Sequence, residues 1–254
     1  MIYSIHDKKI IAPLFGEWEE VCLWSCLQDC MGVAFADDVK TPNSAQTVIG
    51  AFSFLGGTPN DDLIKNIPEN YSSDSIIFVP QNEDWEIAIE NIYKDRAVRK
   101  IRYATKKQKD VFDKAKLQSI VDNLPDEYQI VPIDQEIYNW SKSSPWAKDW
   151  CANFADFESY QKQALGFAII HADEIVAGVS TYAFFKEGIE IQIDTRENYR
   201  RKGLALVCGA KIILECLDRN LYPGWDAQNK GSLAVAKKLG YEFDREYPVY
   251  EVKK

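Results

Sequence analysis

The stretch from Ile189 to Leu217 constrains the fold most strongly, because it reads as a strand, a short turn and a helix in succession. Apolar and polar side chains alternate from Ile189 to Asp194, which is the period of a strand with two different faces. Apolar residues then recur at helical spacing, at Val207, Ala210, Leu214 and Leu217. A strand that leads into a core-facing helix predicts a fold in which helices cover a sheet.

The turn between this strand and helix is basic and contains small residues. In order, it consists of Arg200, Arg201, Lys202, Gly203, Leu204 and Ala205. The first N–H groups of a helix have no partner within the helix, and the helix dipole adds partial positive charge there. Gly203 and Ala205 leave room for an anion to approach the backbone. The turn therefore predicts a phosphate site, and a diphosphate is the simplest ligand.

The polar face of the strand consists of Glu190, Gln192 and Asp194. A strand flanked by a hairpin and a crossover helix is expected to be central in its sheet. A central strand seldom has a wholly polar face unless that face lines a cleft, and a solvated sheet face is the alternative. Because the phosphate turn follows directly, we favour the cleft.

Composition narrows the possible classes of protein. Of the 254 residues, 46% are hydrophobic, which predicts a packed core rather than disorder. The net charge of −9 argues against nucleic-acid partners and against an anionic membrane surface. No apolar run reaches the ~18 residues of a membrane span, and the N-terminal residues lack the apolar region of a signal peptide. Six Cys do not suggest a disulfide scaffold, so a cytoplasmic location is expected.

Two parts are expected, residues 1–110 and 111–254, because a Lys-rich stretch separates two sets of alternating elements. In the first part, helices are predicted at 18–27, 61–67 and 82–93, and strands at 33–37, 47–55, 75–79 and 97–103. In the second part, strands are predicted at 128–133, 166–170, 175–184, 189–195 and 222–227, helices at 202–219 and 230–239, and a strand pair after Tyr241. Hairpins mixed with crossover helices predict an α/β (α+β) fold with a mixed sheet.

A second motif lies downstream of the phosphate turn. Asn229 is placed to cap a helix that ends at Gly240, and both residue types suit those positions. With the turn at 200–205, this second part resembles the GNAT (GCN-five-related N-acetyltransferase) superfamily. The turn resembles the family's Arg/Gln-x-x-Gly-x-Gly/Ala loop for the acyl-CoA pyrophosphate. Four residues resemble its second motif, namely Asn229, Ser232, Gly240 and Tyr241.

A narrower resemblance extends beyond residues 127–254, which the GNAT likeness covers. The run from Glu190 to Thr195 and the segment from Pro223 to Asp226 resemble the subgroup that includes zwittermicin A resistance-type acetyltransferases. This likeness continues into the first part, through Asn43 to Ala45 and Phe52 to Gly57. It implies a GNAT-like C-terminal domain packed on an N-terminal α/β domain with the element order of a degenerate GNAT-like unit.

The resemblance also implies a cofactor and a reaction. A splayed strand pair would admit the pantetheine arm of acetyl-CoA, and backbone N–H groups of residues 201–205 would hold its diphosphate. Asn229 and Ser232 would lie near the pantetheine or a phosphate. A free backbone N–H around Gln192, Ile193 and Asp194 would stabilise the acetyl oxygen. The acetyl group would pass directly to the amine of a small molecule.

An amine must lose a proton before it attacks, and a carboxylate can accept that proton directly or through water. Glu190, on the polar face of the central strand, is the first candidate for this base. Asp194 ranks lower, because it is nearer the phosphate turn and would repel the cofactor unless it is turned away.

The identity of the general acid is open, because the sequence departs from the family at one position. Many GNAT enzymes have a Tyr four residues before the Gly of the second motif, and here that residue is Ala236. Either another group acts as the acid, for which we select Tyr241 with Tyr199 and Ser232 as alternatives, or the thiolate leaves unaided. The departure leaves a non-catalytic acyl-CoA-binding or regulatory module as the alternative function.

The first part lacks the basic turn. Its equivalent segment, Gly56 to Asn60, is followed by Asp61 and Asp62, which suit a helix dipole but would repel a diphosphate. We therefore expect that the first part does not bind CoA and instead helps to form the acceptor site or a scaffold.

Two further clusters are ambiguous. Three indoles, of Trp140, Trp146 and Trp150, are compatible with core packing and with a wall of the acceptor pocket. Three thiols at helical spacing, of Cys22, Cys26 and Cys30, are expected to pack in the core rather than bind a metal, because a fourth ligand is missing.

Overall fold

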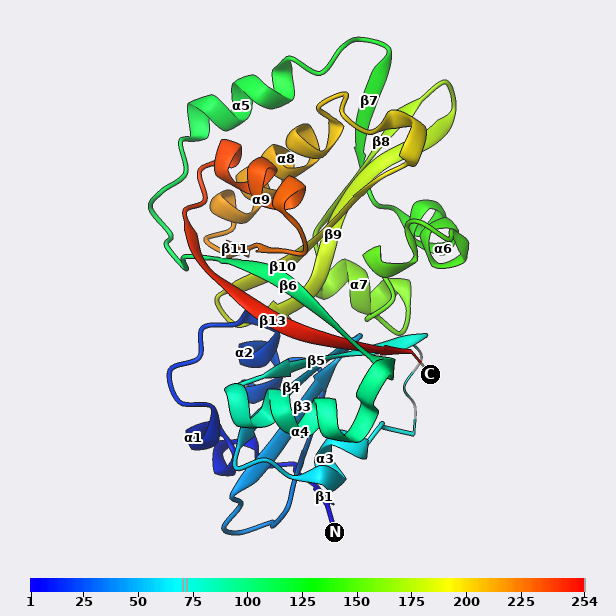
Figure 1. Cartoon of the computed structure of the whole chain (residues 1–254). Helices are drawn as coiled ribbons and strands as arrows, with labels where there is room; N and C mark the ends of the chain where they lie inside the picture. Colours follow the sequence, from blue (N-terminus) through cyan, green and yellow to red (C-terminus); the bar gives the residue numbers. More distant parts are fainter. Residues whose placement is uncertain (70, 72, 254) are drawn as a thin grey trace. The chain divides into compact units, whose positions relative to one another are not determined.

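The computed structural model describes residues 1–69, 71 and 73–253 (Figure 1). It divides into two compact units, one of Met1–Arg102 with Glu246–Lys254 and the other of Tyr103–Arg245. Two strands, β6 (Ala97–Thr105) and β13 (Phe243–Lys253), each run from one unit into the other. These bounds place residues 103–110 with the C-terminal unit and the end of β13 with the N-terminal unit.

The N-terminal unit contains a mixed sheet. From one edge its strands are β1 (Tyr3–Ser4), β2 (Val33–Ala36), β3 (Ser44–Ile49), β4 (Phe52–Gly57), β5 (Ser75–Pro80), the end of β13 and the start of β6. The pairs from β1 to β4 are antiparallel, β4 and β5 are parallel, and β5 is antiparallel to β13. The helices are α1 (Ala12–Phe15), α2 (Val21–Leu27), α3 (Asp61–Lys65) and α4 (Glu83–Tyr93).

The core of this unit joins its strands to α4. Leu55, Phe78 and Tyr250 come from three strands and are buried with Trp85 and Ile89 of α4. Trp85 and Ile89 lie four residues apart on one face of the helix, so a single stripe faces the sheet.

The C-terminal unit contains a five-stranded sheet in the order β11-β10-β9-β8-β7. These strands are β7 (Tyr128–Pro132), β8 (Gly166–His171), β9 (Glu174–Phe185), β10 (Gly188–Thr195) and β11 (Tyr222–Gly224). Only β10 and β11 are parallel in this sheet. A short strand, β12 (Asp226–Ala227), pairs instead with the end of β6.

Helices cover both faces of this sheet (Figure 1). On one side lie α5 (Lys114–Asp122), α8 (Leu204–Asp218) and α9 (Lys230–Leu239), and on the other α6 (Gln135–Ser143) and α7 (Phe157–Gln163). The predicted stripe of α8 is confirmed, because Val207, Ala210 and Leu214 are buried. A Cβ at Gly209 would lie 2.6 Å from the side chain of Leu239, so α8 and α9 approach closely at that glycine.

Most predicted elements and the mixed α/β class are confirmed, and three elements are wrong in detail. The strand predicted at 47–55 is a hairpin, because the chain turns at Gly50, where φ is +52°. The strand predicted at 222–227 is divided between β11 and β12, which have different partners. The predicted strand pair after Tyr241 is the single strand β13, since its two ends belong to different units. Within the described residues, every helix is too short or too polar to span a bilayer.

Candidate functional site

Strands β10 and β11 run side by side at first and then separate. They pair from Gly188 to Glu190, and the last pair joins Glu190 to Gly224. Beyond it, β10 continues to Thr195 with β9 as its partner, whereas the chain after β11 crosses to β6 as β12. Among the described residues, the second half of β10 therefore has a strand on one side only.

Two backbone hydrogen bonds show which residues of β10 face this open side. The N–H of Tyr222 donates to the carbonyl of Glu187 (2.7 Å), so odd-numbered residues direct their backbone groups toward β11. At the other end, the N–H of Arg196 donates to the carbonyl of Val176 in β9 (2.9 Å), so even-numbered residues face β9.

This alternation separates the three residues predicted to offer a backbone donor. Ile193 directs its N–H and C=O to the open side of β10, while the backbone groups of Gln192 and Asp194 face β9. Of these three, Ile193 is thus the residue whose N–H is available to a ligand.

Helix α8 begins without a side-chain cap. Its N-cap is Gly203, and its first turn contains no acidic residue. The other helices of nine or more residues, α4, α5, α6 and α9, each start with an Asn or Asp that accepts a backbone N–H. Five consecutive N–H groups at this corner have no partner in the part of the chain that the structure describes, those of Arg201, Lys202, Gly203, Leu204 and Ala205.

The backbone of this corner is shaped for close approach. Arg201 and Gly203 both adopt positive φ, of +63° and +85°. No heavy atom lies within 4 Å of the position that a Cβ on Gly203 would take. Open amides, the helix dipole and free space together are the features that suit an anion.

The side chains around the turn hold its shape. The exposed Arg200 donates from Nε to the carbonyl of Thr195 (3.3 Å). The ammonium of Lys202 lies 4.7 Å from the ring centre of Tyr199. The hydroxyl of Tyr199 is in turn 3.0 Å from Nδ1 of His171. These contacts fix the turn through its side chains and leave the amides open.

Glu190 lies where the strands separate. Its side chain is buried, with 7% exposed, and Oε1 accepts the N–H of Asp226 at 2.8 Å. Asp226 belongs to β12, so the carboxylate satisfies a backbone donor that has left the sheet of β10. This bond orients Glu190 at the last position where β10 pairs with β11.

Asp194 is held by two side chains on its face of β10. Its Oδ2 accepts from Nε1 of Trp150 (3.1 Å) and from Nε2 of Gln192 (2.8 Å). Burial raises the pKa of Asp194, and the hydrogen bonds from Gln192 and Trp150 oppose that shift. The charge of Arg200 also lowers the pKa of this carboxyl, so Asp194 lies within electrostatic reach of the basic turn.

The start of α9 uses both predicted residues. Asn229 is the N-cap and accepts the N–H of Ser232 (2.9 Å). The hydroxyl of Ser232 accepts from the indole of Trp225 (3.1 Å). Ala236 is fully buried one turn further along the same helix face.

Tyr241 is held in the interior. Its hydroxyl donates to the carbonyl of Pro223 in β11 at 2.7 Å. Burial raises the pKa of Tyr241 well above its usual value. The phenol therefore links the segment after α9 to β11 and stays protonated.

The structure brings Glu190, Gln192 and Asp194 to one face of β10 and the five amides to its end. Sequence reasoning did not assign Trp150 to this face, although its indole binds Asp194. Gly178 was the available signal, since a Cβ there would lie 2.2 Å from the ring of Trp150. A glycine in the middle of a strand indicates such a close approach.

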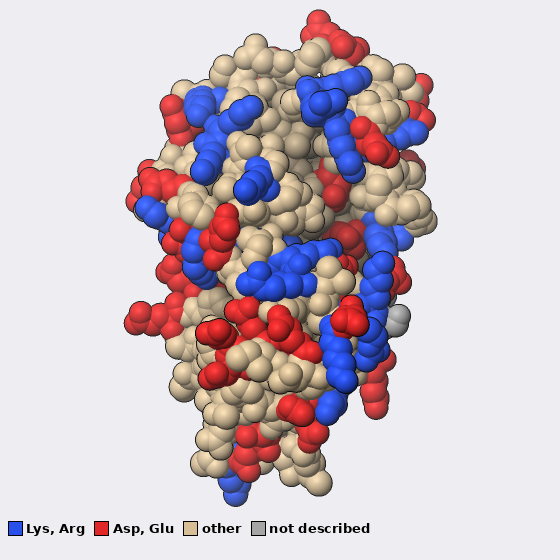
Figure 2. All heavy atoms as spheres, in the orientation of Figure 1, with Lys and Arg blue, Asp and Glu red and all other residues tan. Residues whose placement is uncertain are grey.

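Two other features bear on ligands. Within the described ranges, no group of three or more His, Cys, Asp and Glu could hold a metal ion. On the face that Figure 2 shows, Lys and Arg are interspersed with Asp and Glu.

Known proteins resemble this chain over most of its length. The family model described as GNAT acetyltransferase matches residues 12–250. A GCN5-related N-acetyltransferase-like protein from Streptococcus suis 89/1591 is 43% identical, with a TM-score of 0.91, over 97% of this chain and 98% of that one. YdfB of Bacillus subtilis (strain 168), named an uncharacterized N-acetyltransferase, is 28% identical over 88% of this chain and 86% of its own length.

A more distant structure shows the same fold. The tandem GNAT protein from the clavulanic acid biosynthesis pathway has a TM-score of 0.59 at 9% identity, over 100% of this chain and 98% of that one. The predicted GNAT membership is confirmed, and the zwittermicin A resistance-type subgroup stays a prediction. The chain belongs to the GNAT acetyltransferase family and is an acetyltransferase of that type.

Proposed function

We propose that this enzyme transfers an acetyl group from acetyl-CoA directly to the amine of a small molecule. One observation carries the proposal: among the described residues, five open amides at the start of α8 lie at the end of a strand whose second half is unpaired on one side. Members of the GNAT family generally use acetyl-CoA, which supplies an activated acetyl thioester.

The residues present fit this cofactor. Backbone N–H groups of residues 201–205 would bind the diphosphate, because they have no partner in the described part of the chain and the space beside Gly203 is open. The open backbone of β10 would pair with the amide groups of pantetheine. The N–H of Ile193 would donate to the oxygen that gains negative charge during transfer.

Glu190 is the proposed general base. The N–H of Asp226 fixes Oε1, so the carboxylate has one orientation at the point where β10 and β11 separate. It would accept the proton of the acceptor amine, directly or through a water molecule, and a positioned base of this kind contributes about 10²–10⁴-fold to a rate.

Ser232 is the hydroxyl best placed to donate a proton to the departing thiolate. The hydroxyl of Tyr241, the acid expected from the sequence, donates to Pro223 in the interior and suits a positioning role better. Ser232 accepts from Trp225, and among the described residues its own hydroxyl hydrogen has no acceptor. It lies one helical turn before Ala236, on the face where many relatives have a Tyr.

The N-terminal unit is proposed not to bind CoA, because its equivalent corner is already filled. Strands β4 and β5 pair in parallel as far as Leu55. Beyond that point Oε1 of Gln81 accepts the N–H of Gly57 (3.0 Å), and Nε1 of Trp85 donates to the carbonyl of Gly57 (2.9 Å). Both side chains occupy backbone groups that a pantetheine arm would need.

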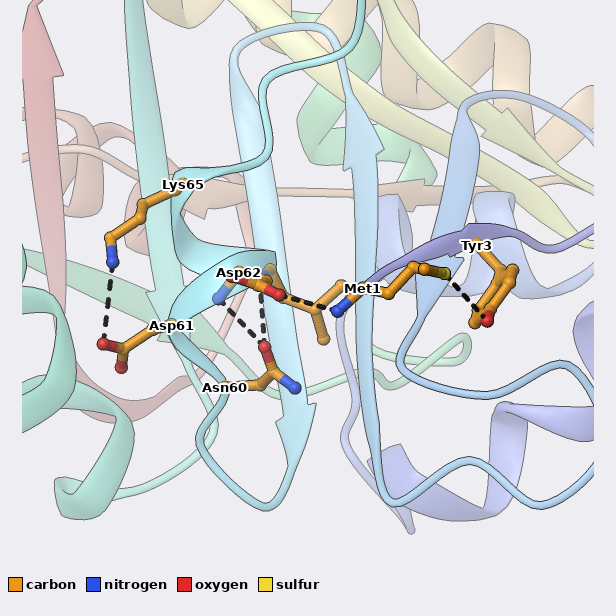
Figure 3. Close-up of polar contacts among 7 residues, drawn as sticks. Met1, Tyr3, Asn60, Asp61, Asp62 and Lys65 are labelled. Carbon is orange, nitrogen blue, oxygen red and sulfur yellow. Dashed lines mark hydrogen bonds and ion pairs between the residues drawn. The ribbon is translucent and has the colours of Figure 1, made fainter.

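The helix at this corner is capped as well (Figure 3). Asn60 accepts the N–H groups of Asp62 and Leu63 at 2.9 and 3.3 Å. Asp61 and Asp62 add two carboxylates to the first turn of α3, and Asp62 binds the amino group of Met1 at 2.8 Å. At this corner the side chain of Asn60 therefore occupies amides whose counterparts at α8 are open, and two carboxylates would repel an anion.

Calorimetry with acetyl-CoA, followed by thiol release in a panel of amines, tests the function. We expect one acetyl-CoA per chain, and thiol release that depends on an amine. A stoichiometry of two would contradict the proposal for the N-terminal unit. Absence of binding at millimolar acetyl-CoA would overturn the function as a whole.

The same experiment distinguishes the transferase from a non-catalytic alternative. Ala236 has no hydroxyl at the position where many GNAT enzymes have a Tyr, and this favours a non-catalytic acyl-CoA-binding module as the second candidate. Tight binding without thiol release for any amine would support that module and remove the transferase.

A further inference from the structure

The polar face of β10 has a second feature beyond Glu190: an indole cluster beside a carboxylate. The rings of Trp140, Trp146 and Trp150 are mutually close, with centroids 5.6, 6.0 and 5.2 Å apart. Trp150 is fully buried, whereas Trp140 and Trp146 are only partly buried. The cluster therefore has a core end, where Trp150 meets the sheet, and an accessible end.

Trp150 connects this cluster to the strand. Its ring fills the space above Gly178, where a Cβ would lie 2.2 Å away. Gly178 is the cross-strand partner of Asp194, so side chains at these two positions share a face. The indole N–H of Trp150 then binds Oδ2 of Asp194 at 3.1 Å.

Asp194 has no cationic partner in the part of the chain that the structure describes. Both of its hydrogen-bond donors, the indole of Trp150 and the amide of Gln192, are neutral and use the same oxygen. No Lys, Arg or His forms an ion pair with it among the residues that the structure describes. The nearby charges are Asp149, which raises its pKa further, and Arg200, whose effect is smaller and whose Nε is bound to Thr195.

A partly buried carboxylate without a cation is unfavourable, and it is relieved by a cationic ligand. Accessible indole faces attract the same kind of group. We propose that the acceptor carries a second cationic group, which binds Asp194 next to the indole cluster of Trp140, Trp146 and Trp150.

The spacing defines the class of acceptor. Glu190 and Asp194 are four residues apart on one face of a strand, a separation of roughly 13 Å along the backbone. An extended diamine or polyamine spans such a distance, with one amine at Glu190 and the other at Asp194. This inference rests on the proposed function, because Glu190 marks the position of acetyl transfer.

The test compares two amines of equal chain length. Diaminooctane has an amine at each end, and octylamine has one. Calorimetry in the presence of CoA is expected to show at least about tenfold tighter binding of the diamine, which corresponds to ~1.4 kcal/mol. Thiol release should show the same ratio in kcat/KM.

Variants locate the effect. Asp194→Asn should lower the affinity for diaminooctane to that for octylamine, whereas Asp173→Asn, in the exposed turn between β8 and β9, should keep the preference. Trp146→Leu leaves every charge in place and should weaken diamine binding several-fold. It also serves as the test if the Asp194 variant does not fold.

Equal affinity of the two amines in the unmodified enzyme would overturn the inference, as would a preference that survives Asp194→Asn. The amines are also titrated without CoA, and a preference that depends on Asp194 supports the inference there too. Failure of acetyl-CoA binding would contradict the proposed function alone, so the two outcomes are distinguishable.

Discussion

Replacing Gly203 by Ala adds one methyl group at the centre of the proposed diphosphate site. The residue has φ of +85° and ψ of −3°, and no atom lies within 4 Å of the new Cβ. The methyl therefore meets no protein atom, and its effects are limited to backbone strain and to contact with a ligand.

The two effects differ in size. A non-glycine residue in the left-handed region costs about 1–2 kcal/mol, and each kcal/mol lowers Tm by about 2–4 °C in a protein of this size. A hydrogen bond to a charged group is worth about 1.5–3 kcal/mol. Loss of one or two of the five amide contacts would thus weaken acetyl-CoA binding by about 10- to 10⁴-fold, at about tenfold for each 1.4 kcal/mol.

Calorimetry with acetyl-CoA and thermal unfolding measure the two effects on the same samples. Gly16→Ala is the control for backbone strain, because Gly16 also has positive φ (+58°, with ψ of −136°) and open space at its Cβ, but lies in the N-terminal unit. We expect both variants to lose stability and only Gly203→Ala to lose affinity. An unchanged affinity of the Gly203 variant, with a lowered Tm, would refute the assignment of the anion site.

Three further outcomes are expected. Glu190→Gln should lower kcat by about 10²–10⁴-fold. The amide oxygen of the new Gln can keep the bond to Asp226, so the affinity for acetyl-CoA should be retained. Glu187→Gln, on the exposed turn before β10, removes the same charge elsewhere and is the control. Tyr241→Phe should cost about 1–2 kcal/mol in urea unfolding and spare most of the thiol-release rate, and a collapse of the rate in a stable variant would restore Tyr241 as the acid. Asp194→Asn should make the protein more stable at neutral pH and leave its stability unchanged at acid pH. The folded pKa of Asp194 is raised, so its carboxyl favours the folded state below the ordinary pKa, and this contribution is lost as pH rises through the folded value. The Asn side chain stays neutral at every pH. Equal free energies of unfolding in urea for the two proteins across the pH range would contradict this prediction.

The strand and helix pattern of the C-terminal unit could be predicted, because each element carries its period in its own residues. The alternation from Ile189 to Asp194 and the stripe of α8 needed no information from elsewhere in the chain. The strand partners of residues 222–227 could not be predicted in this way. The β-strand character of this segment is local, but the separation of β11 from β12 depends on the position of β6, more than a hundred residues earlier.

The same distinction applies to the site. The open amides at Gly203 follow from a glycine and a basic turn before a helix, which the sequence displays directly. The roles of Tyr241 and Ser232 depend on which partner each hydroxyl meets, and both partners lie in the segment from Pro223 to Trp225. Composition and spacing contain no information about such partners, so sequence alone left three candidates for the acid.

The two strand–turn–helix corners differ in the N-cap hydrogen bonds that stabilise their helices. At α3 the side chain of Asn60 satisfies two amides, and an N-cap of this kind is worth about 1 kcal/mol. At α8 the cap is Gly203, and the first-turn amides have no protein partner in the described ranges. Helix α8 persists without this contribution because most of its length is buried against the sheet and α9. Burial along α8 therefore offsets the missing cap, whereas at α3 the side chain of Asn60 and the carboxylates of Asp61 and Asp62 already occupy the corner, and of these two corners only the one at α8 is available to an anion.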